Sequence, residues 1–279
     1  MSCDLHTHST CSDGSQTPQE IVAEAIAKNL TALAIADHDT VQGVVPAIEA
    51  ARGSDLRVIP AVEISTEFKK TEVHILGYWI ELDNAALHEK FTYVREARRL
   101  RADEIVSKLR QNGVEITIDD VLAQSDGVSL GRPHVAQALL EKGYVKDMQN
   151  AFDRFLGRDK PAFVPRYKLS PYEAVEAIHE ARGCPVLAHP GLGVSDYVID
   201  GLIEAGIEGL EAYHTHHSPS NTRRAIRIAE QHGLLITGGT DSHGPKGSYP
   251  VEVGSLDIPD ACAEGLVAWA EEHGAPMPD

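Results

Sequence analysis

Residues 3–8, Cys3-Asp4-Leu5-His6-Thr7-His8, form a short apolar run that ends in two histidines. Further short apolar runs follow along the chain and alternate with helical patterns. This alternation is typical of repeated strand–helix units and a largely parallel sheet. The sequence therefore predicts seven strands, at Cys3–His6, Ala32–Ala36, Arg57–Ile64, Glu72–Trp79, Pro185–Ala188, Gly209–Tyr213 and Leu234–Thr237.

Several helices between these runs have a recognisable start. Thr17-Pro18-Gln19-Glu20 and Ser170-Pro171-Tyr172-Glu173 each place a hydroxyl at the cap, a proline at the first helical position and a glutamate at the third. Ser218-Pro219 begins another helix.

About a hundred residues separate the fourth and fifth runs, far more than the dozen that a crossover helix needs. This stretch has helical patterns at Ala85–Gln111, Asp119–Gln124, Pro133–Glu141 and Asp147–Leu156. We therefore predict an α/β fold with two parts. A seven-unit barrel or barrel-like sheet comprises residues 1–98 and 166–279, and a small helical subdomain is inserted at 99–165.

Composition limits the class of protein. A chain of 279 residues suits one large domain with a subdomain. Its four cysteines show no Cys-x-x-Cys spacing, which argues against a disulfide framework or a thiolate zinc site. The first residues do not resemble a signal peptide, and no run of about 18 apolar residues occurs. We expect a cytoplasmic protein without a membrane partner.

The net charge of −17 argues against a broad electrostatic grip on long duplex nucleic acid or anionic membranes. The charge is unevenly distributed. Residues 98–168 contain 13 Lys and Arg against 10 Asp and Glu, whereas the rest of the chain has 12 against 32. The insertion is thus a cationic island in an acidic protein.

Histidines and carboxylates recur at the ends of the predicted strands, where barrel enzymes place their chemistry, and we expect all seven strand ends to meet at one mouth. A lone His-x-His is more often a solvated loop pair than a metal site. Repetition in phase with the strands favours a metal site, because burying so many polar groups without cations would cost several kcal/mol. Nitrogen and oxygen ligands without sulfur suit Mn²⁺, Fe²⁺ or Zn²⁺. The candidate ligands are His6, His8, Asp13, His38, Glu63, His74, His189, Asp241 and His243, and two further histidines, His214 and His216, also follow a predicted strand.

Five motifs resemble the PHP (polymerase and histidinol phosphatase) superfamily. They are Asp4-Leu5-His6-Thr7-His8-Ser9 with Ser12-Asp13-Gly14, Asp37-His38-Asp39-Thr40, Glu63-Ile64-Ser65, Ala188-His189-Pro190 and Gly239-Thr240-Asp241-Ser242-His243. The resemblance spans the chain apart from the insertion. It implies a distorted (βα)7 barrel that holds two or three divalent ions, with Mn²⁺ expected and Zn²⁺ or Fe²⁺ as alternatives.

The resemblance also implies how the ligands are shared among three ions. The first ion would be held by His6, His8, Glu63 and Asp241. The second would be held by Glu63, His74 and His189, and the third by Asp13, His38 and His243. Clustered divalent ions can lower the pKa of a bound water to about 7. The expected nucleophile is therefore a metal-bound hydroxide held by Glu63 and Asp241, and His216 is a candidate acid for the leaving group.

Two segments of the insertion, Gly131-Arg132-Pro133-His134-Val135-Ala136 and residues 151–157, resemble one PHP branch. That branch hydrolyses nucleoside 3′,5′-bisphosphates and trims short RNA, and it releases the 3′-phosphate from the bisphosphate. Taken alone, the first segment is equally consistent with a surface arginine and a helix-capping histidine. An exposed, ion-paired helix face would also explain Arg99. The expected substrate contacts are Arg99, Ser129, Arg132, His134, Lys168 and His214.

Three functions remain open. The first is hydrolysis of the 3′-phosphate of nucleoside bisphosphates, with 5′-3′ trimming of short RNA. The second is a phosphatase for histidinol phosphate or another small molecule, and the third is a non-catalytic, metal-stabilised accessory domain. A complete ligand set argues against the third function. The cationic insertion favours the first, because a substrate with two phosphates needs cations for the phosphate that does not react, whereas histidinol phosphate carries an ammonium.

Overall fold

The computed structural model describes residues 2–69, 71–124, 131–165, 169–246 and 250–275. The chain divides into two compact units: unit 1 is Met1–His88 with Lys168–Asp279, and unit 2 is Glu89–Tyr167. The division into a metal-binding barrel and a lid at residues 98/99 and 165/166 remains a prediction.

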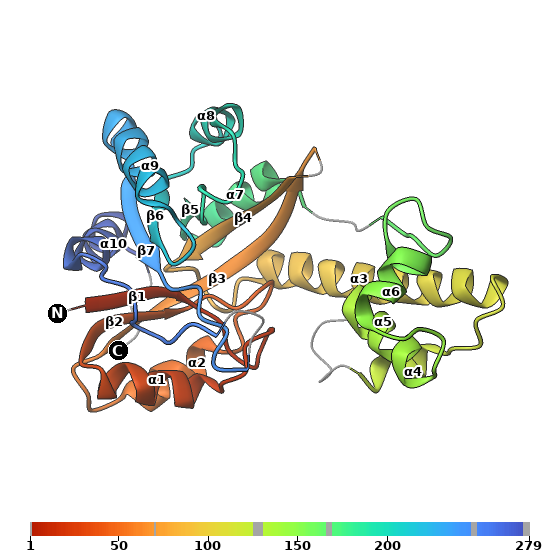
Figure 1. The fold of residues 1–279 in the computed structure, drawn as a ribbon. Helices are drawn as coiled ribbons and strands as arrows, with labels where there is room; N and C mark the ends of the chain where they lie inside the picture. Colours follow the sequence, from red (N-terminus) through yellow and green to blue (C-terminus); the bar gives the residue numbers. More distant parts are fainter. Residues whose placement is uncertain (1, 70, 125–130, 166–168, 247–249, 276–279) are drawn as a thin grey trace. The chain divides into compact units, whose positions relative to one another are not determined.

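In the described part of unit 1, seven strands form one sheet in chain order that curves into a barrel (Figure 1). Backbone hydrogen bonds close the barrel: Asp241 N–H donates to His6 O at 2.9 Å, and His8 N–H donates to Ser242 O at 2.8 Å. All seven predicted strands are confirmed. They are β1 (Ser2–Thr7), β2 (Leu30–Ile35), β3 (Arg57–Phe68), β4 (Thr71–Tyr78), β5 (Cys184–Leu187), β6 (Gly209–His214) and β7 (Leu235–Gly239).

The direction of β4 differs from the prediction. This strand runs antiparallel to both β3 and β5, whereas the remaining neighbours in the sheet are parallel. The expectation that all seven strand ends meet at one mouth is therefore wrong for β4. β3 ends at Phe68 and β4 begins at Thr71, so their connection is far too short for a crossover helix. His74 lies within this strand, as the predicted range Glu72–Trp79 placed it.

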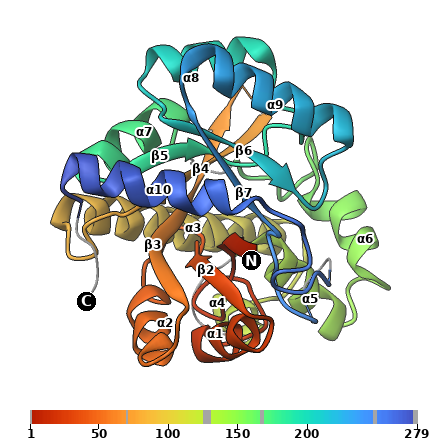
Figure 2. The same cartoon turned by 90° about the vertical axis from the view of Figure 1, so that its left-hand side faces the viewer.

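Helices surround the barrel of unit 1 (Figure 2). Thr17 and Ser170 form the predicted capping boxes, and Ser218 caps a third helix. The helix closest to the C-terminus covers one end of the barrel, where Trp79 Nε1–H donates to Leu266 O at 2.8 Å. The helices are α1 (Pro18–Ala27), α2 (Val44–Ala51), α7 (Pro171–Glu180), α8 (Asp196–Glu204), α9 (Pro219–His232) and α10 (Asp260–His273).

The buried core inside the barrel consists largely of small and aliphatic side chains. Leu5, Ala34, Ala61 and Val186 belong to one cluster with Leu266 of α10. Because α10 packs where the strands begin, it closes the barrel end opposite the ligand-type residues that follow the strands.

Unit 2 is helical, as predicted. α3 (Ala85–Gln111) begins in unit 1 and continues into unit 2. Buried aliphatic side chains such as Leu109, Val121 and Leu139 form a separate core. Among the described residues, no helix combines the length and the apolar character needed to span a membrane. The other helical segments of unit 2 are α4 (Ile118–Leu122), α5 (Arg132–Glu141), α6 (Met148–Ala151) and the π-helical η1 (Phe152–Leu156).

Candidate metal centre

The closing strands of the barrel place two ligand-type residues side by side. β1 carries His6, and Asp241 follows the end of β7. A Cβ added to Gly239 would lie 2.1 Å from the Cβ of His6, so only glycine permits this approach. Asp241 and His189 have left-handed backbones, with φ of 56° and 30°. Such conformations are uncommon for residues other than glycine and cluster at functional sites.

Asp37 shapes the loop that carries Asp13. Its carboxylate accepts hydrogen bonds from the amide and hydroxyl of Ser9, both at 2.7 Å, and from the Ser12 hydroxyl at 2.6 Å. A Cβ on Gly14 would lie 2.1 Å from His8 O, so the tight return of this loop also requires glycine. The loop thereby places Asp13 beside His8.

Glu63 lies at the centre of the cluster and is fully buried. Its Oε1 is 2.9 Å from His74 Nδ1 and 3.0 Å from His189 Nε2. Its Oε2 is 2.9 Å from His38 Nδ1 and 3.4 Å from His6 Nε2. The two oxygens therefore face different sets of histidines, as a carboxylate shared between two ions would.

A second group of ligand atoms lies between β1 and β7. His8 Nε2 is 3.1 Å from His6 Nε2 and 3.0 Å from Asp241 Oδ1. The ligand atoms of these three residues all lie within 4.8 Å of one another.

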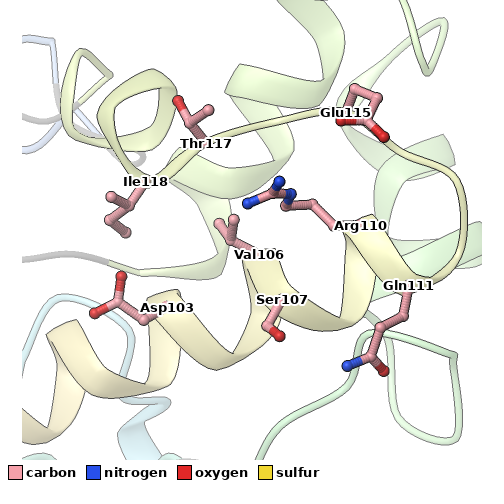
Figure 3. Close-up of a pocket in the computed structure, with 8 residues that line it drawn as sticks. All are labelled: Asp103, Val106, Ser107, Arg110, Gln111, Glu115, Thr117 and Ile118. Atoms are coloured by element: carbon pink, nitrogen blue, oxygen red, sulfur yellow. The ribbon is translucent and has the colours of Figure 1, made fainter.

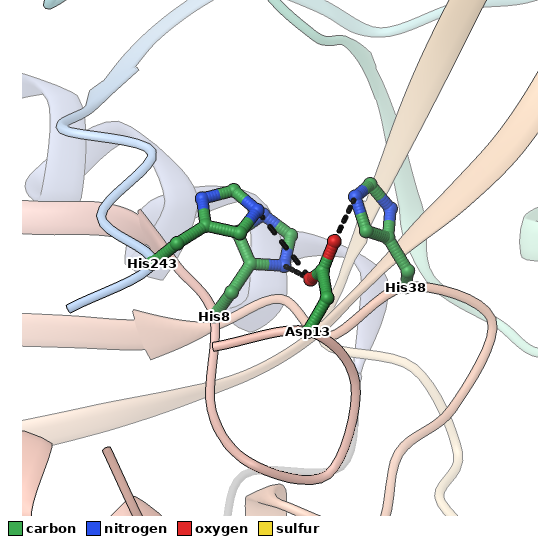
Figure 4. Close-up of side chains that lie close together, drawn as sticks. All are labelled: His8, Asp13, His38 and His243. Atoms are coloured by element: carbon green, nitrogen blue, oxygen red, sulfur yellow. Dashed lines mark ion pairs between the residues drawn. The ribbon is translucent and has the colours of Figure 1, made fainter. Parts of the chain in front are cut away.

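A third group surrounds Asp13 (Figure 4). Asp13 Oδ1 is 3.4 Å from His243 Nε2 and 3.8 Å from His8 Nδ1, and Asp13 Oδ2 is 3.8 Å from His38 Nε2. His8 thus faces two groups, and His38 faces both this group and Glu63. The sequence analysis gave each of these histidines to one ion, and that assignment remains a prediction.

The chemistry of the cluster suits divalent cations. Among the described residues, the buried His8 Nδ1 has no hydrogen-bond partner, and Glu63 Oε2 meets its neighbouring imidazoles only in ion-pair contacts, the shortest at 2.9 Å from His38 Nδ1. Leaving buried polar atoms unpaired is costly, and a coordinated cation would remove that cost. The donors are imidazole nitrogens and carboxylate oxygens, which bind Mn²⁺, Fe²⁺ and Zn²⁺. The residues present therefore fit a metal centre.

Electrostatics support the same conclusion. Burial lowers the pKa of His8, but hydrogen bonds to Asp241 and Glu63 outweigh burial and raise this pKa to about 10. Burial raises the pKa of Glu63, but the neighbouring His38 and His74 hold it well below its ordinary value. The carboxylates therefore stabilise positive charge in the cluster. Because a metal ligand must be deprotonated, a divalent ion would take the place of the protons on these rings.

Glu211, within β6, was missed by the sequence analysis. It is fully buried, its Oε1 lies 3.0 Å from His6 Nδ1, and its Oε2 accepts the His189 backbone N–H at 2.8 Å. A carboxylate on one ring nitrogen of a histidine directs the other nitrogen to a metal. The available signal was an acidic residue inside the apolar run Gly209–Tyr213.

The structure places His214 beside the cluster. Its Nε2 is 3.3 Å from Asp241 Oδ2, and its Nδ1 accepts the His216 backbone N–H at 3.1 Å. His214 is buried and His216 is exposed. The roles proposed for these two histidines, in substrate binding and as the leaving-group acid, remain predictions.

The other predicted substrate contacts lie outside the cluster. In unit 2, Arg132 Nη1 donates to Leu156 O at 3.3 Å, and His134 Nδ1 accepts the Gly131 N–H at 3.0 Å and so caps α5. Arg99 is exposed on α3. Two further predicted contacts lie outside the described residues, Ser129 and Lys168.

Unit 2 also contains a pocket of about 600 Å³ between α3 and the segment that leads into α4 (Figure 3). Arg110 shares this pocket with the carboxylates of Asp103 and Glu115. Because the pocket contains both positive and negative side chains, it does not favour binding of an anion. None of the residues that line the pocket belongs to the metal cluster. The pocket is therefore not assigned a role in the reaction.

The family of the chain follows from comparison with known proteins. Residues 4–156, more than half of the chain, match the PHP domain. The chain belongs to the PHP domain family. This PHP protein is similar to a candidate metal-dependent phosphoesterase from Bifidobacterium adolescentis, whose crystal structure gives a TM-score of 0.78 at 32% identity over 95% of both chains. With its ligand cluster, it is a metal-dependent phosphoesterase.

Two curated relatives of this PHP protein have more specific names. A 3′,5′-nucleoside bisphosphate phosphatase from Chromobacterium violaceum is 34% identical over 266 residues, which are 93% of each chain. The 5′-3′ exoribonuclease Rnm of Escherichia coli is 32% identical over 249 residues, 87% of this chain and 85% of the relative.

Proposed function

We propose that this PHP protein hydrolyses the 3′-phosphate of nucleoside 3′,5′-bisphosphates to give 5′-nucleotides, and that it trims short RNA from the 5′ end. The observation that carries the proposal is the buried cluster around Glu63, in which carboxylates and histidines converge from separate strands. Similarity to a bisphosphate phosphatase over 93% of the chain supports the substrate class.

The proposed cofactors are two or three divalent ions, with Mn²⁺ as the natural metal. Bound there, they would activate water and neutralise charge on the phosphoryl oxygens. The chain's own residues supply orientation and protons. Glu63 and Asp241 orient the attacking water, and His216 donates a proton to the leaving oxygen. The ring of His216 lies 5.7 Å from that of His214 and is exposed, so it can exchange protons with solvent.

Arg132 is proposed to bind the phosphate that does not react. A guanidinium suits this task because its fork of N–H donors matches phosphate oxygens. The side chain of Arg132 lies near two aromatic rings, with Cζ 5.7 Å from the ring centre of Phe152 and 6.0 Å from that of Phe163. These contacts and the hydrogen bond to Leu156 O restrict the guanidinium before substrate arrives.

The orientation of the substrate can be tested from the products. Adenosine 3′,5′-bisphosphate should yield 5′-AMP and inorganic phosphate, because the 3′-phosphate reacts at the metals while the 5′-phosphate is retained. 3′-AMP should react more slowly, since it lacks the binding energy of the second phosphate, which helps to position the reacting one. Phosphorus NMR of the products decides the matter. Release of 3′-AMP would reverse the orientation, and a preference for histidinol phosphate over every nucleotide would refute the proposed substrate class.

Replacing Arg132 by alanine should weaken binding of the bisphosphate by about 1.5 kcal/mol or more, the lower value for a hydrogen bond to a charged group. Hydrolysis of a simple aryl phosphate should change little, because that substrate has no second phosphate. Arg154 provides a matched control in unit 2, since it also stacks on an aromatic ring, Phe155, and donates to a backbone carbonyl. Arg154→Ala should leave the preference unchanged. Equal losses on both substrates in Arg132→Ala would place Arg132 at the reacting phosphate or in the fold.

A further inference from the structure

A cluster of aromatic side chains and one lysine lies on the rim of unit 1. We call it the rim patch; it consists of Phe68 at the end of β3, Lys69, Tyr172 in the first turn of α7 and Tyr197 in the first turn of α8. The ring centre of Phe68 is 5.8 Å from that of Tyr172 and 6.2 Å from that of Tyr197. Lys69 Nζ is 5.1 Å from the ring centre of Phe68 and 5.2 Å from that of Tyr197.

The topology places the rim patch on the same side of the barrel as the metal cluster. β3 passes Glu63 before it reaches Phe68, and α7 and α8 begin where the parallel strands end. Phe68 is five positions beyond Glu63 on the strand, which corresponds to about 17 Å of extended chain. The rim patch therefore lies beyond the reach of a single nucleotide whose phosphate is at the metals, but within reach of a longer strand.

Packing accounts for part of the rim patch only. The Tyr172 hydroxyl lies so close to α8 that a Cβ on Gly201 would be 2.6 Å away, so Tyr172 fills a space between two helices. Tyr197, by contrast, is 67% exposed, and Lys69 is also exposed. A large aromatic ring left in solvent beside a cation has the composition of a surface that stacks nucleobases and contacts their phosphates.

We propose that the rim patch binds unpaired bases of an RNA strand on the 3′ side of the phosphate that reacts. Tyr197 stacks on a base, and Lys69 contacts a backbone phosphate. Stacking suits a chain of net charge −17, because it gains affinity without a broad basic surface. This inference rests on the proposed function and specifies how the same site distinguishes RNA from a mononucleotide.

The test compares substrates of different length in the full-length protein with Mn²⁺. Tyr197→Ala should leave kcat/KM for adenosine 3′,5′-bisphosphate unchanged. For 5′-phosphorylated oligoadenylates, from dinucleotides to octanucleotides, kcat/KM should fall increasingly with length, by about 5-fold or more for the longest, as expected for loss of one stacked base. Tyr197→Phe should retain activity, because it keeps the ring. Tyr93→Ala, which removes a tyrosine that is 52% exposed on α3, is the matched control.

Binding measured without turnover separates this inference from the proposed function. Fluorescence anisotropy of a labelled oligoadenylate with metal-depleted protein should show weaker binding in Tyr197→Ala and Lys69→Ala, whether or not cleavage occurs. Unchanged oligomer binding in both variants, or equal losses on the bisphosphate and the oligomers, would overturn the rim patch as an RNA site. Failure of the parent protein to hydrolyse any nucleotide, with oligomer binding still dependent on Tyr197, would refute the proposed function alone.

Discussion

Glu63→Ala is expected to abolish phosphoesterase activity and to reduce bound metal. Glu63 is buried, and its two oxygens contact different histidines, at 2.9 Å from His74 and 2.9 Å from His38. If Glu63 is shared between two ions as proposed, the substitution would remove one ligand from each of them, and it leaves the facing imidazoles without their carboxylate. Loss of a residue that only hydrogen-bonds to the metal ligands typically lowers activity by about 10- to 100-fold. Loss of Glu63 should lower activity by more than that. Metal analysis of the purified variant and assay with excess Mn²⁺ provide the measurements.

A control for this variant is available on the same strand. Glu67 lies four residues further along β3 and is exposed. Glu67→Ala should keep full metal content and turnover. Full metal occupancy together with normal turnover in Glu63→Ala would refute the metal centre as assigned.

Glu211→Gln is expected to weaken metal binding by about 10- to 100-fold without a comparable loss of stability in the metal-free protein. The carboxylate accepts one hydrogen bond from the His6 ring and one from the His189 amide. A glutamine has one acceptor oxygen, so it must present N–H donors to one of these partners. If the donors face His6 Nδ1, the ring takes the tautomer with a proton on Nε2, the nitrogen that faces the cluster. If they face the His189 amide, the left-handed backbone at that residue is disturbed.

Titration calorimetry with Mn²⁺ measures the affinity, and nitrogen-15 NMR of the imidazoles reports the tautomer of His6. Glu208, immediately before β6, accepts a hydrogen bond from Trp269 outside the cluster and offers a matched substitution. Glu208→Gln should bind Mn²⁺ as the parent does. Unchanged affinity in Glu211→Gln would show that Glu211 does not orient the ligands.

Local patterns in the sequence predicted most of the fold. Each strand is a short apolar run, and Thr17 and Ser170 cap helices through interactions within a few residues. The reversed direction of β4 also had a local signal, since the predicted third strand ended at Ile64 and the fourth began at Glu72. A connection of that length fits a hairpin and not a crossover. The alternation of strands and helices elsewhere in the chain favours a parallel strand here, and for β4 that prediction is wrong.

The candidate site could be predicted only in part, because sharing between ligands depends on geometry across the barrel. The sequence marks His8 and His38 as ligand types, but only the folded chain shows that each faces two groups. Glu211 resembles any charged residue near the end of a strand until its contacts with His6 and His189 are known. Such residues act through partners distant in sequence, which neither periodicity nor spacing identifies.

The closure of the barrel has a consequence for the order of folding. Thr240 donates to the carboxylate of Asp4 across the contact between β1 and β7, and these residues are 236 positions apart. The hairpin of β3 and β4 forms from neighbouring segments instead. Because closing a long loop costs more entropy than closing a short one, the hairpin should form early and this contact late. A divalent ion held by His6 and Asp241 would then stabilise the last contact to form. Removal of the ion would speed unfolding that starts at the contact between β1 and β7.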